Sequence, residues 1–132
     1  SGWYILGRQV QEFEASLARF WSMGHAAGVA SGLDALEISL RAAGLQLGDK
    51  VLTTPLSAFA TTLAIVRAGG VPVFCDTGAN GLLDLAEAEA ALRATPGIRF
   101  FVPVHLDGFP IDPVRLRRLI DSYGLICIED SA

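Results

Sequence analysis

Residues 50–75 of the chain read KVLTTPLSAFATTLAIVRAGGVPVFC, and this stretch decides the fold. Its first residues, KVLTTP (50–55), are typical of a buried strand that stops at a proline, and VPVFC (71–75) is a second apolar run of strand length. The segment between them has apolar residues at helical spacing and ends on two glycines, namely Phe59, Leu63 and Val66 followed by Gly69 and Gly70. A strand, a helix and a strand in succession predict two parallel strands joined by a crossover helix.

The same alternation continues toward the C-terminus. The apolar runs IRFFVPV (98–104) and LICIED (125–130) predict two further strands. A helix is expected ahead of each run, because Asp84 stands at capping-box spacing from Glu87, and Asp112 precedes a proline at a first helical position. The inner faces of these two helices are predicted to be Leu85, Ala88 and Leu92 in the first and Leu116, Leu119 and Ile120 in the second.

Toward the N-terminus the pattern predicts two more helices, the first over residues 9–21. The apolar face of the second helix, which a glycine ends, is predicted to consist of Leu33, Leu36, Leu40 and Ala43 ahead of Gly44. Between the two helices, HAAGVAS (25–31) is a run of small residues that we interpret as a short, tightly packed strand.

Short apolar strands that alternate with capped helices predict an α/β protein, in which a mostly parallel sheet lies between two layers of helices. VPVFC is expected at an edge of that sheet, because Pro72 has no N–H to donate to a neighbouring strand. No repeat, low-complexity tract or linker interrupts the pattern. The three-layer α/β/α arrangement is therefore predicted to extend over the chain as one domain of 132 residues.

The composition narrows the classes of function. Apolar residues make up 52% of the chain and charged residues 18%, so much apolar surface must be buried or must contact another chain. The net charge of −4 argues against nucleic-acid binding, and no apolar run is long enough for a membrane span or a signal peptide. Cys75 and Cys127 lie inside apolar runs, which favours core thiols in a reducing cytoplasm. His25 and His105 lack metal-like spacing, so no metal site is expected.

Ligands of open α/β sheets bind beyond the carboxyl ends of the strands. This rule selects the segments Ser31–Asp34, Thr53–Phe59, Cys75–Asp76, His105–Gly108 and Glu129–Ser131. At Ser31 and Gly32 the chain turns into a helix, whose free N–H groups would bind an anion such as phosphate. The same residues also fit a simple helix cap, with Ser31 as the N-cap and Asp34 as its box partner.

Three further residues each allow two interpretations. The carboxylate of Asp130 ends a buried strand, where it would need a cation such as a protonated cofactor ring nitrogen, but Asp is also a preferred N-cap of a following helix. His105 could contact a ligand or only hydrogen-bond its own loop, and we favour the loop role. Phe59 could stack on a flat ring, although an aromatic residue at that spacing is more typical of a core.

The chain contains, in this order, SGWYILGRQVQEFE, VASGLDALEISLRAAGLQLGDKVLTTP, ATTLAIVRAGGVPVFCD, VPVHLDGFPIDP and LICIEDSA. This ordered set resembles the DegT/DnrJ/StrS family of sugar aminotransferases. Its members are pyridoxal-phosphate enzymes of the aspartate aminotransferase fold (fold type I), which add amino groups to nucleotide-linked keto sugars in amino-sugar, cell-surface polysaccharide or antibiotic sugar biosynthesis. The resemblance covers essentially the whole chain and implies the N-terminal part of the large, cofactor-binding domain.

The resemblance implies roles for two of the segments. The helix start of the family's SGTDAL motif, which holds the cofactor phosphate, is matched here by Ser31, Gly32, Leu33 and Asp34. The family's EDAAQA motif is matched by EDSA (129–132), and this match implies that Asp130 pairs with the pyridinium nitrogen, so that the ring can act as an electron sink.

At several other positions the sequence departs from the family pattern. The family's ring-stacking aromatic falls at Ala58, so Phe59, one residue later, is our candidate for that contact. Ala58, His105 and Ser131 are expected close around the site. Two further departures are Leu33, where the family has threonine, and Asp107, where it has an aromatic residue; the second change implies an altered loop or a different substrate.

Two functional groups of the family have no counterpart in the sequence. The glutamine that follows the aspartate and the lysine that forms the Schiff base are both absent, and the one lysine of the chain, Lys50, precedes a strand. Transamination needs that lysine as covalent anchor and proton carrier. We therefore predict that this polypeptide alone is inactive, and that the family's C-terminal small domain is absent from it.

The family also implies partners: a nucleotide-sugar substrate, an amino-acid donor and a second subunit that completes the site. Residues 25–31 and the run LICIE would lack their family neighbours, which predicts self-association through an exposed sheet edge or a displaced N-terminal segment. Two other hypotheses remain. One is a non-catalytic α/β module that assembles or regulates, and the other is a different enzyme of this fold, such as a carbon–sulfur lyase or an aldolase.

Overall fold

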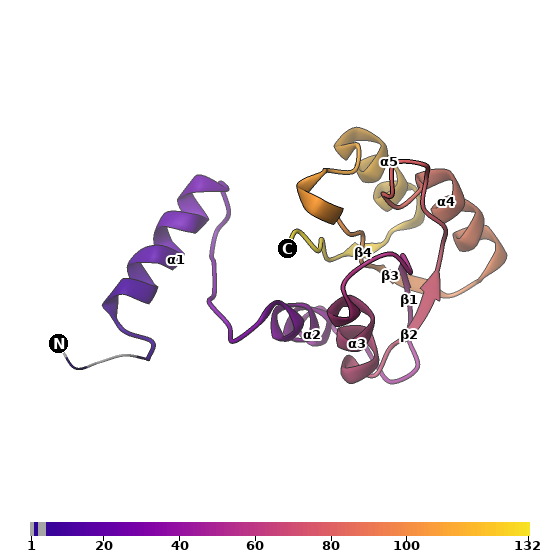
Figure 1. Ribbon diagram of the computed structural model, residues 1–132. Coiled ribbons are helices and arrows are strands. Elements are labelled where there is room, and N and C mark those ends of the chain that lie inside the picture. The colour runs from indigo at the N-terminus through magenta and orange to yellow at the C-terminus, as the bar shows by residue number, and fades with distance from the viewer. Residues whose placement is uncertain (1, 3–4) are drawn as a thin grey trace. The chain divides into compact units, whose positions relative to one another are not determined.

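The computed structural model describes residue 2 and residues 5–132, and these residues form two compact units, one within residues 1–30 and one over residues 31–132. Figure 1 shows the helices and strands of both units along the chain. The first unit contains one helix. The second contains the sheet and the helices that cover it.

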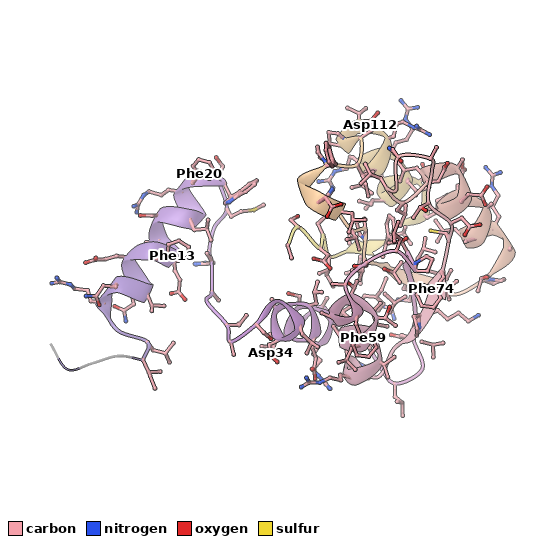
Figure 2. All side chains as sticks on the ribbon, in the orientation of Figure 1. Phe13, Phe20, Asp34, Phe59, Phe74 and Asp112 are labelled. Carbon is pink, nitrogen blue, oxygen red and sulfur yellow. The ribbon has the colours of Figure 1, made fainter. Side chains whose placement is uncertain are left out.

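The helix of the first unit is α1 (Arg8–Phe20), which confirms the helix predicted for residues 9–21. Its aromatic side chains stand out from the helix (Figure 2): Phe13 is 62% exposed and Phe20 is 80% exposed. Phe20 packs edge-on against Trp21, with 5.6 Å between the ring centroids. Among residue 2 and residues 5–132, no helix is both long enough and apolar enough to cross a bilayer.

The strand predicted for residues 25–31 is wrong. This segment forms no strand, and its contact with the helix is a hydrogen bond of 2.6 Å from the N–H of Gly28 to Oε1 of Glu14. A strand forms only where a neighbour satisfies its backbone N–H and C=O groups. No strand in the described part of the chain pairs with this segment. A run of small residues predicts close packing but does not supply the neighbour.

The second unit alternates helices and strands as predicted. Its elements are α2 (Gly32–Ala42), β1 (Lys50–Thr53), α3 (Phe59–Ala68), β2 (Val71–Phe74), α4 (Leu85–Ala94), β3 (Ile98–Phe101), the short 3₁₀ helix η1 (Leu106–Gly108), α5 (Pro113–Tyr123) and β4 (Ile126–Cys127). The helices begin where the sequence indicates. Asp84 accepts hydrogen bonds from the N–H groups that open α4, and Asp112 does the same for α5.

The four strands form one sheet in the order β2-β1-β3-β4, and every pairing between named strands is parallel. Pro72 lies on the edge strand β2, as its missing N–H requires. The ladder continues past β4, because Asp130 bridges to Val104 in parallel register. Asp130 is therefore held by the sheet itself, beyond the carboxyl end of the last strand.

Helices cover both faces of this sheet, which confirms the three-layer α/β/α prediction. One face packs against α2 and α3, and its buried cluster is Leu36, Leu40, Leu45, Val51, Ala64, Ile65, Ala68, Phe100 and Val102. The other face packs against α4 and α5 through a second cluster that includes Leu52, Leu85, Ala88, Leu92, Phe101, Leu116 and Leu119. Neighbouring strand residues such as Phe100 and Phe101 contribute to opposite faces, because strand side chains alternate.

The inner face of α3 does not include Phe59. Phe59 and Val66 of α3 are 76% and 53% exposed, and the buried residues of this helix are Thr61, Ala64, Ile65 and Ala68. The core interpretation of Phe59 is therefore wrong. Three of these four buried residues are small, so α3 packs close to α2 and to the sheet, and Phe59 and Val66 are left at the surface.

The two cysteines are free thiols, as predicted. Cys75 is 6% exposed, and burial raises its pKa to about 12; burial also raises the pKa of the half-buried Cys127 to about 12. Both values lie above the ordinary thiol value of 9.0, so the unfolded chain releases these protons first as pH rises. The stabilisation from keeping the thiols neutral is thus complete below pH 9 and is lost as the pH approaches 12.

We therefore expect the free energy of unfolding to fall between pH 9 and pH 12, and to fall more steeply for the wild type than for the double variant Cys75→Ala, Cys127→Ala. Denaturant unfolding followed by circular dichroism at intervals over this range measures both slopes. The variant is also the baseline for every other group of the chain, because it differs from the wild type only at the two thiols. Equal slopes would show that the thiols do not contribute.

Candidate functional site

Asp130 is one of the few buried polar residues, with 9% of its surface exposed. Its N–H donates to the carbonyl of Pro103 at 2.9 Å, and its own carbonyl accepts from the N–H of His105 at 2.9 Å. These two backbone bonds fix the residue against the strand beside it. The side chain is consequently presented from a rigid position rather than from a flexible terminus.

The Asp130 carboxylate is held by a hydroxyl from α3. Oγ1 of Thr61 donates to Oδ2 of Asp130 at 2.7 Å, and Oγ of Ser57 lies 2.7 Å from the same Thr61 oxygen. Among residue 2 and residues 5–132, Oδ1 of Asp130 accepts only a long bond of 3.3 Å from the N–H of Ala132. Among the described residues no cationic side chain pairs with Asp130, so this buried carboxylate lacks the countercharge that such a group ordinarily needs.

The start of α3 partly offsets that deficit. Thr61 lies in the first turn of α3, where the helix dipole is positive and favours a nearby anion. Thr61 and Ser57 were not among the residues predicted from sequence. Two hydroxyl residues four positions apart at the start of a helix can be recognised in the sequence. The neighbouring residues, however, do not indicate that Thr61 bonds a carboxylate 69 positions further along the chain.

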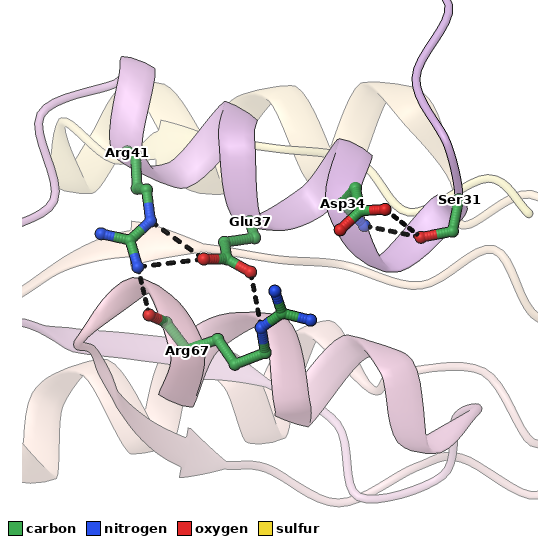
Figure 3. A network of polar contacts seen from close by, with 5 residues as sticks. All are labelled: Ser31, Asp34, Glu37, Arg41 and Arg67. Carbon is green, nitrogen blue, oxygen red and sulfur yellow. Dashed lines mark hydrogen bonds and ion pairs between the residues drawn. The ribbon is translucent and has the colours of Figure 1, made fainter.

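The Ser31 turn confirms the helix-cap interpretation. Oγ of Ser31 accepts from the N–H of Asp34 at 3.1 Å, and the Ser31 hydroxyl donates to Oδ2 of Asp34 at 2.7 Å (Figure 3). A methyl group added at Gly32 would meet nothing within 4 Å, so the backbone here is open. In the described part of the chain the N–H groups of Gly32 and Leu33 have no hydrogen-bond partner, and they remain free to donate.

An ion-pair network fixes α2 against α3. Oε1 of Glu37 pairs with Nη2 of Arg41 at 3.0 Å within α2, and Oε2 of Glu37 pairs with Nε of Arg67 of α3 at 2.8 Å (Figure 3). The Arg41 guanidinium also donates to the backbone carbonyl of Arg67. This network therefore fixes α2, whose N-cap is Ser31, against α3, which carries Thr61.

The Ser31 turn and Asp130 lie at the same edge of the sheet. Asp130 follows the carboxyl end of β4, and α2 runs back toward the start of β1, so α2 begins at the carboxyl edge. Ile128, two residues before Asp130, packs against the cluster that contains Leu36 of α2. The two groups are therefore brought to one edge and to one face, the face covered by α2 and α3.

His105 has the loop role that we favoured. Its Nδ1 accepts the N–H of Ile111 at 3.1 Å, so the ring proton lies on Nε2, which donates to Oε2 of Glu129 at 2.8 Å. The neighbouring Asp107 adopts a positive φ of 54° inside η1. His105 thus connects this loop to the residue beside Asp130, but no hydrogen bond joins its side chain to the Asp130 carboxylate in the described chain.

The remaining predicted residues are placed as follows. Phe59 is the first residue of α3, and Ala58 is its N-cap, so both stand at the helix start that faces Asp130. Ser131 is exposed. Lys50 lies at the start of β1, at the opposite edge of the sheet, where its Nζ donates to the carbonyl of Pro96 at 3.0 Å. Lys50 is thus remote from the candidate site.

The sequence matches the DegT/DnrJ/EryC1/StrS aminotransferase family over residues 1–132. It is 42% identical to the erythromycin biosynthesis sensory transduction protein EryC1 of Saccharopolyspora erythraea and 40% identical to the dTDP-3-amino-3,4,6-trideoxy-alpha-D-glucose transaminase of Streptomyces venezuelae. Both alignments cover 100% of this chain, but only 36% and 35% of the two relatives. The chain therefore spans about a third of the length of these curated relatives.

The fold of the chain also matches solved structures. The crystal structure of S. venezuelae DesV in complex with a ketimine intermediate superimposes with a TM-score of 0.93 at 40% identity, over 100% of this chain and 35% of DesV. The structure of NtdA from Bacillus subtilis with bound cofactor PMP gives a TM-score of 0.88 at 34% identity, over 94% of this chain and 28% of NtdA. A family match over every residue, on a fold shared with these enzymes, shows that the chain belongs to the DegT/DnrJ/EryC1/StrS aminotransferase family.

Proposed function

We propose that this chain forms the N-terminal part of the large domain of a pyridoxal-phosphate-dependent aminotransferase that acts on nucleotide-linked keto sugars. The observation that carries the proposal is the buried Asp130 carboxylate, which has hydrogen bonds but no cationic partner among the described residues. The relatives support the substrate class, since one of them is a transaminase named for a dTDP-linked amino sugar.

The residues present fit this cofactor. A buried carboxylate suits a protonated ring nitrogen, because the pair neutralises a charge that is costly to bury alone. The free N–H groups of Gly32 and Leu33 suit the phosphate. The negative charge of Asp34 disfavours a phosphate nearby, but the Asp34 carboxylate already accepts a hydrogen bond from the Ser31 hydroxyl. The exposed ring of Phe59 is available to stack on the cofactor ring.

Pyridoxal phosphate, when bound, supplies the electron sink of the reaction. The part of this chain is to hold the ring and to keep its nitrogen protonated through Asp130. The Ser31 turn would fix the phosphate, and Phe59 would cover one ring face. The lysine that must form the Schiff base and carry the proton is not in the sequence, so this polypeptide by itself is proposed to bind the cofactor without catalysing transamination.

The proposed enzyme has further partners. An amino-acid donor and the nucleotide sugar would be bound largely by residues outside this sequence. For this polypeptide by itself we propose a homo-oligomer formed through the edge of the sheet at β4, because in the described chain β4 pairs only with β3 and its other side is free. Two free, uncoordinated cysteines fit a reducing cytoplasm as the compartment.

The proposal is tested with pyridoxine 5′-phosphate, which carries the ring and the phosphate but no aldehyde, so it cannot react with Lys50. We expect weak binding to the wild-type chain, observed by ring fluorescence, and displacement by inorganic phosphate. Asp130→Asn should weaken binding by at least about tenfold, since the charge-assisted bond to the ring nitrogen is lost. Asp121→Asn is the matched control, because Asp121 is 66% exposed on α5 and pairs only loosely with Arg117.

Two results would contradict the proposal. Equal affinity of the wild type and Asp130→Asn for pyridoxine 5′-phosphate would show that Asp130 does not pair with the ring nitrogen. Absence of binding at any concentration would favour a non-catalytic module built on the same fold. Circular dichroism of each variant ensures that a loss of affinity does not reflect a loss of structure.

A further inference from the structure

We propose that Thr61 is a positioning residue for the cofactor ring: it holds Asp130 so that one carboxylate oxygen, Oδ1, is presented to the ring nitrogen. This inference rests on the proposed function. It goes beyond it by assigning a role to a residue of α3 that touches neither the ring nor the phosphate. The Thr61 side chain is 1% exposed, so its hydroxyl has to find its partners inside the protein.

The two oxygens of the Asp130 carboxylate are used unequally. Oδ2 accepts the Thr61 hydroxyl at 2.7 Å, a distance typical of a strong bond to a charged acceptor. Within the part of the chain that the structure describes, Oδ1 accepts only the N–H of Ala132 at 3.3 Å, near the limit of a hydrogen bond. Oδ1 therefore has acceptor capacity left. The bond from Thr61 fixes the rotation of the carboxylate, and this rotation decides where Oδ1 lies.

Ser57 fixes the direction of the hydroxyl that holds Asp130. A carboxylate can only accept, so the single proton of Thr61 is committed to Oδ2. The Thr61 oxygen must then accept from Ser57, whose Oγ lies 2.7 Å away. The chain of donation runs from Ser57 to Thr61 to Asp130. If the Ser57 hydroxyl were removed, Thr61 would keep its bond to Asp130 but would lose the neighbour that polarises it.

Threonine also suits the role sterically. A threonine hydroxyl inside a helix commonly bonds a carbonyl of the preceding turn of the same helix. The Thr61 hydroxyl instead points away from α3, to the carboxylate of Asp130 beside the sheet. Branching at Cβ restricts the side chain to few rotamers, which keeps the hydroxyl aimed. Valine has nearly the same shape without the hydroxyl, and serine has the hydroxyl without the methyl group. These two replacements separate packing from hydrogen bonding.

The test compares two ligands that differ only at the ring nitrogen: pyridoxine 5′-phosphate and its 1-deaza analogue, in which a C–H replaces the nitrogen. We expect the wild type to prefer the pyridine ligand. Thr61→Val should reduce that preference by about tenfold, because a bond to a charged group is lost, and Thr61→Ser should restore most of it. Thr62→Val is the matched control, since Thr62 lies on the same helix and makes no side-chain hydrogen bond in the described chain.

The outcomes separate this inference from the proposed function. If the wild type binds both ligands equally or binds neither, the proposed function fails and this inference fails with it. If the wild type discriminates and Thr61→Val discriminates equally well, the role of Thr61 is refuted while the proposed function stands. A merely structural role for Thr61 would weaken both ligands alike and leave their ratio unchanged.

A second variant covers the case in which Thr61→Val does not fold. Ser57→Ala removes only the first hydroxyl of the series, at a half-buried position outside α3. It should reduce the preference for the pyridine ligand by about threefold, since it weakens the Thr61 bond without removing it. If folded Ser57→Ala protein keeps the wild-type ratio of affinities for the two ligands, the proposed series of hydrogen bonds from Ser57 to Thr61 to Asp130 is refuted.

Discussion

Replacing Phe100 by alanine is expected to lower the free energy of unfolding by about 3–5 kcal/mol. Phe100 is 0% exposed and lies on β3, between β1 and β4. Its ring belongs to the cluster that α2 and α3 cover, so its removal leaves a cavity under both helices that carry the candidate site. A cavity at the centre of a sheet is hard to fill by relaxation, because strands on both sides hold the backbone in place.

Denaturant unfolding followed by circular dichroism measures this loss. The matched control is Phe109→Ala, because Phe109 is 67% exposed and its removal should change stability by no more than about 0.5 kcal/mol. Equal losses in the two variants would mean that the described core does not carry the stability of the chain. A loss at Phe100 alone would locate that stability in the face beneath α2 and α3.

The elements that could be predicted from the sequence are those fixed by local rules. The starts of α4 and α5 are set by Asp84 and Asp112, whose side chains bond N–H groups two or three residues away. The edge position of β2 follows from Pro72, because proline lacks a donor whatever surrounds it. In each case the cause and the effect lie within a few residues, so a short window of sequence contains both.

The features that could not be predicted depend on distant partners. The inner face of α3 packs against α2 and the sheet through Ile65 and smaller residues, and the exposure of Phe59 follows from that packing rather than from its spacing. The run of small residues at 25–31 has no neighbouring strand in the described chain. The hydroxyl that holds Asp130 comes from Thr61, 69 positions earlier. A single sequence does not reveal such pairs.

Gly70 offers a test of how tightly the face under α3 is packed. Replacing it by alanine is expected to destabilise the chain by about 1–2 kcal/mol. An added Cβ would lie 3.0 Å from Cγ2 of Val51, 3.1 Å from Cγ2 of Ile65 and 3.2 Å from Cδ1 of Leu45. All three neighbours are buried, at 0%, 0% and 6% exposure, so none can move aside without disturbing the core.

Whether Gly70→Ala lowers or raises stability shows which of two effects is larger: the crowding of the added Cβ, or the loss of conformational freedom in the unfolded chain. Glycine to alanine stabilises by about 0.4–1 kcal/mol where the folded backbone permits alanine, because the unfolded chain loses conformations. The φ of Gly70 is not positive, so the backbone does permit it, and a net loss must come from the three contacts. Gly32→Ala is the matched control, since an added Cβ there meets nothing within 4 Å, and its stability should be unchanged or slightly raised. Thermal or denaturant unfolding of both variants decides the matter: a stabilised Gly70→Ala would show that the space between β1 and α3 is looser than these distances indicate.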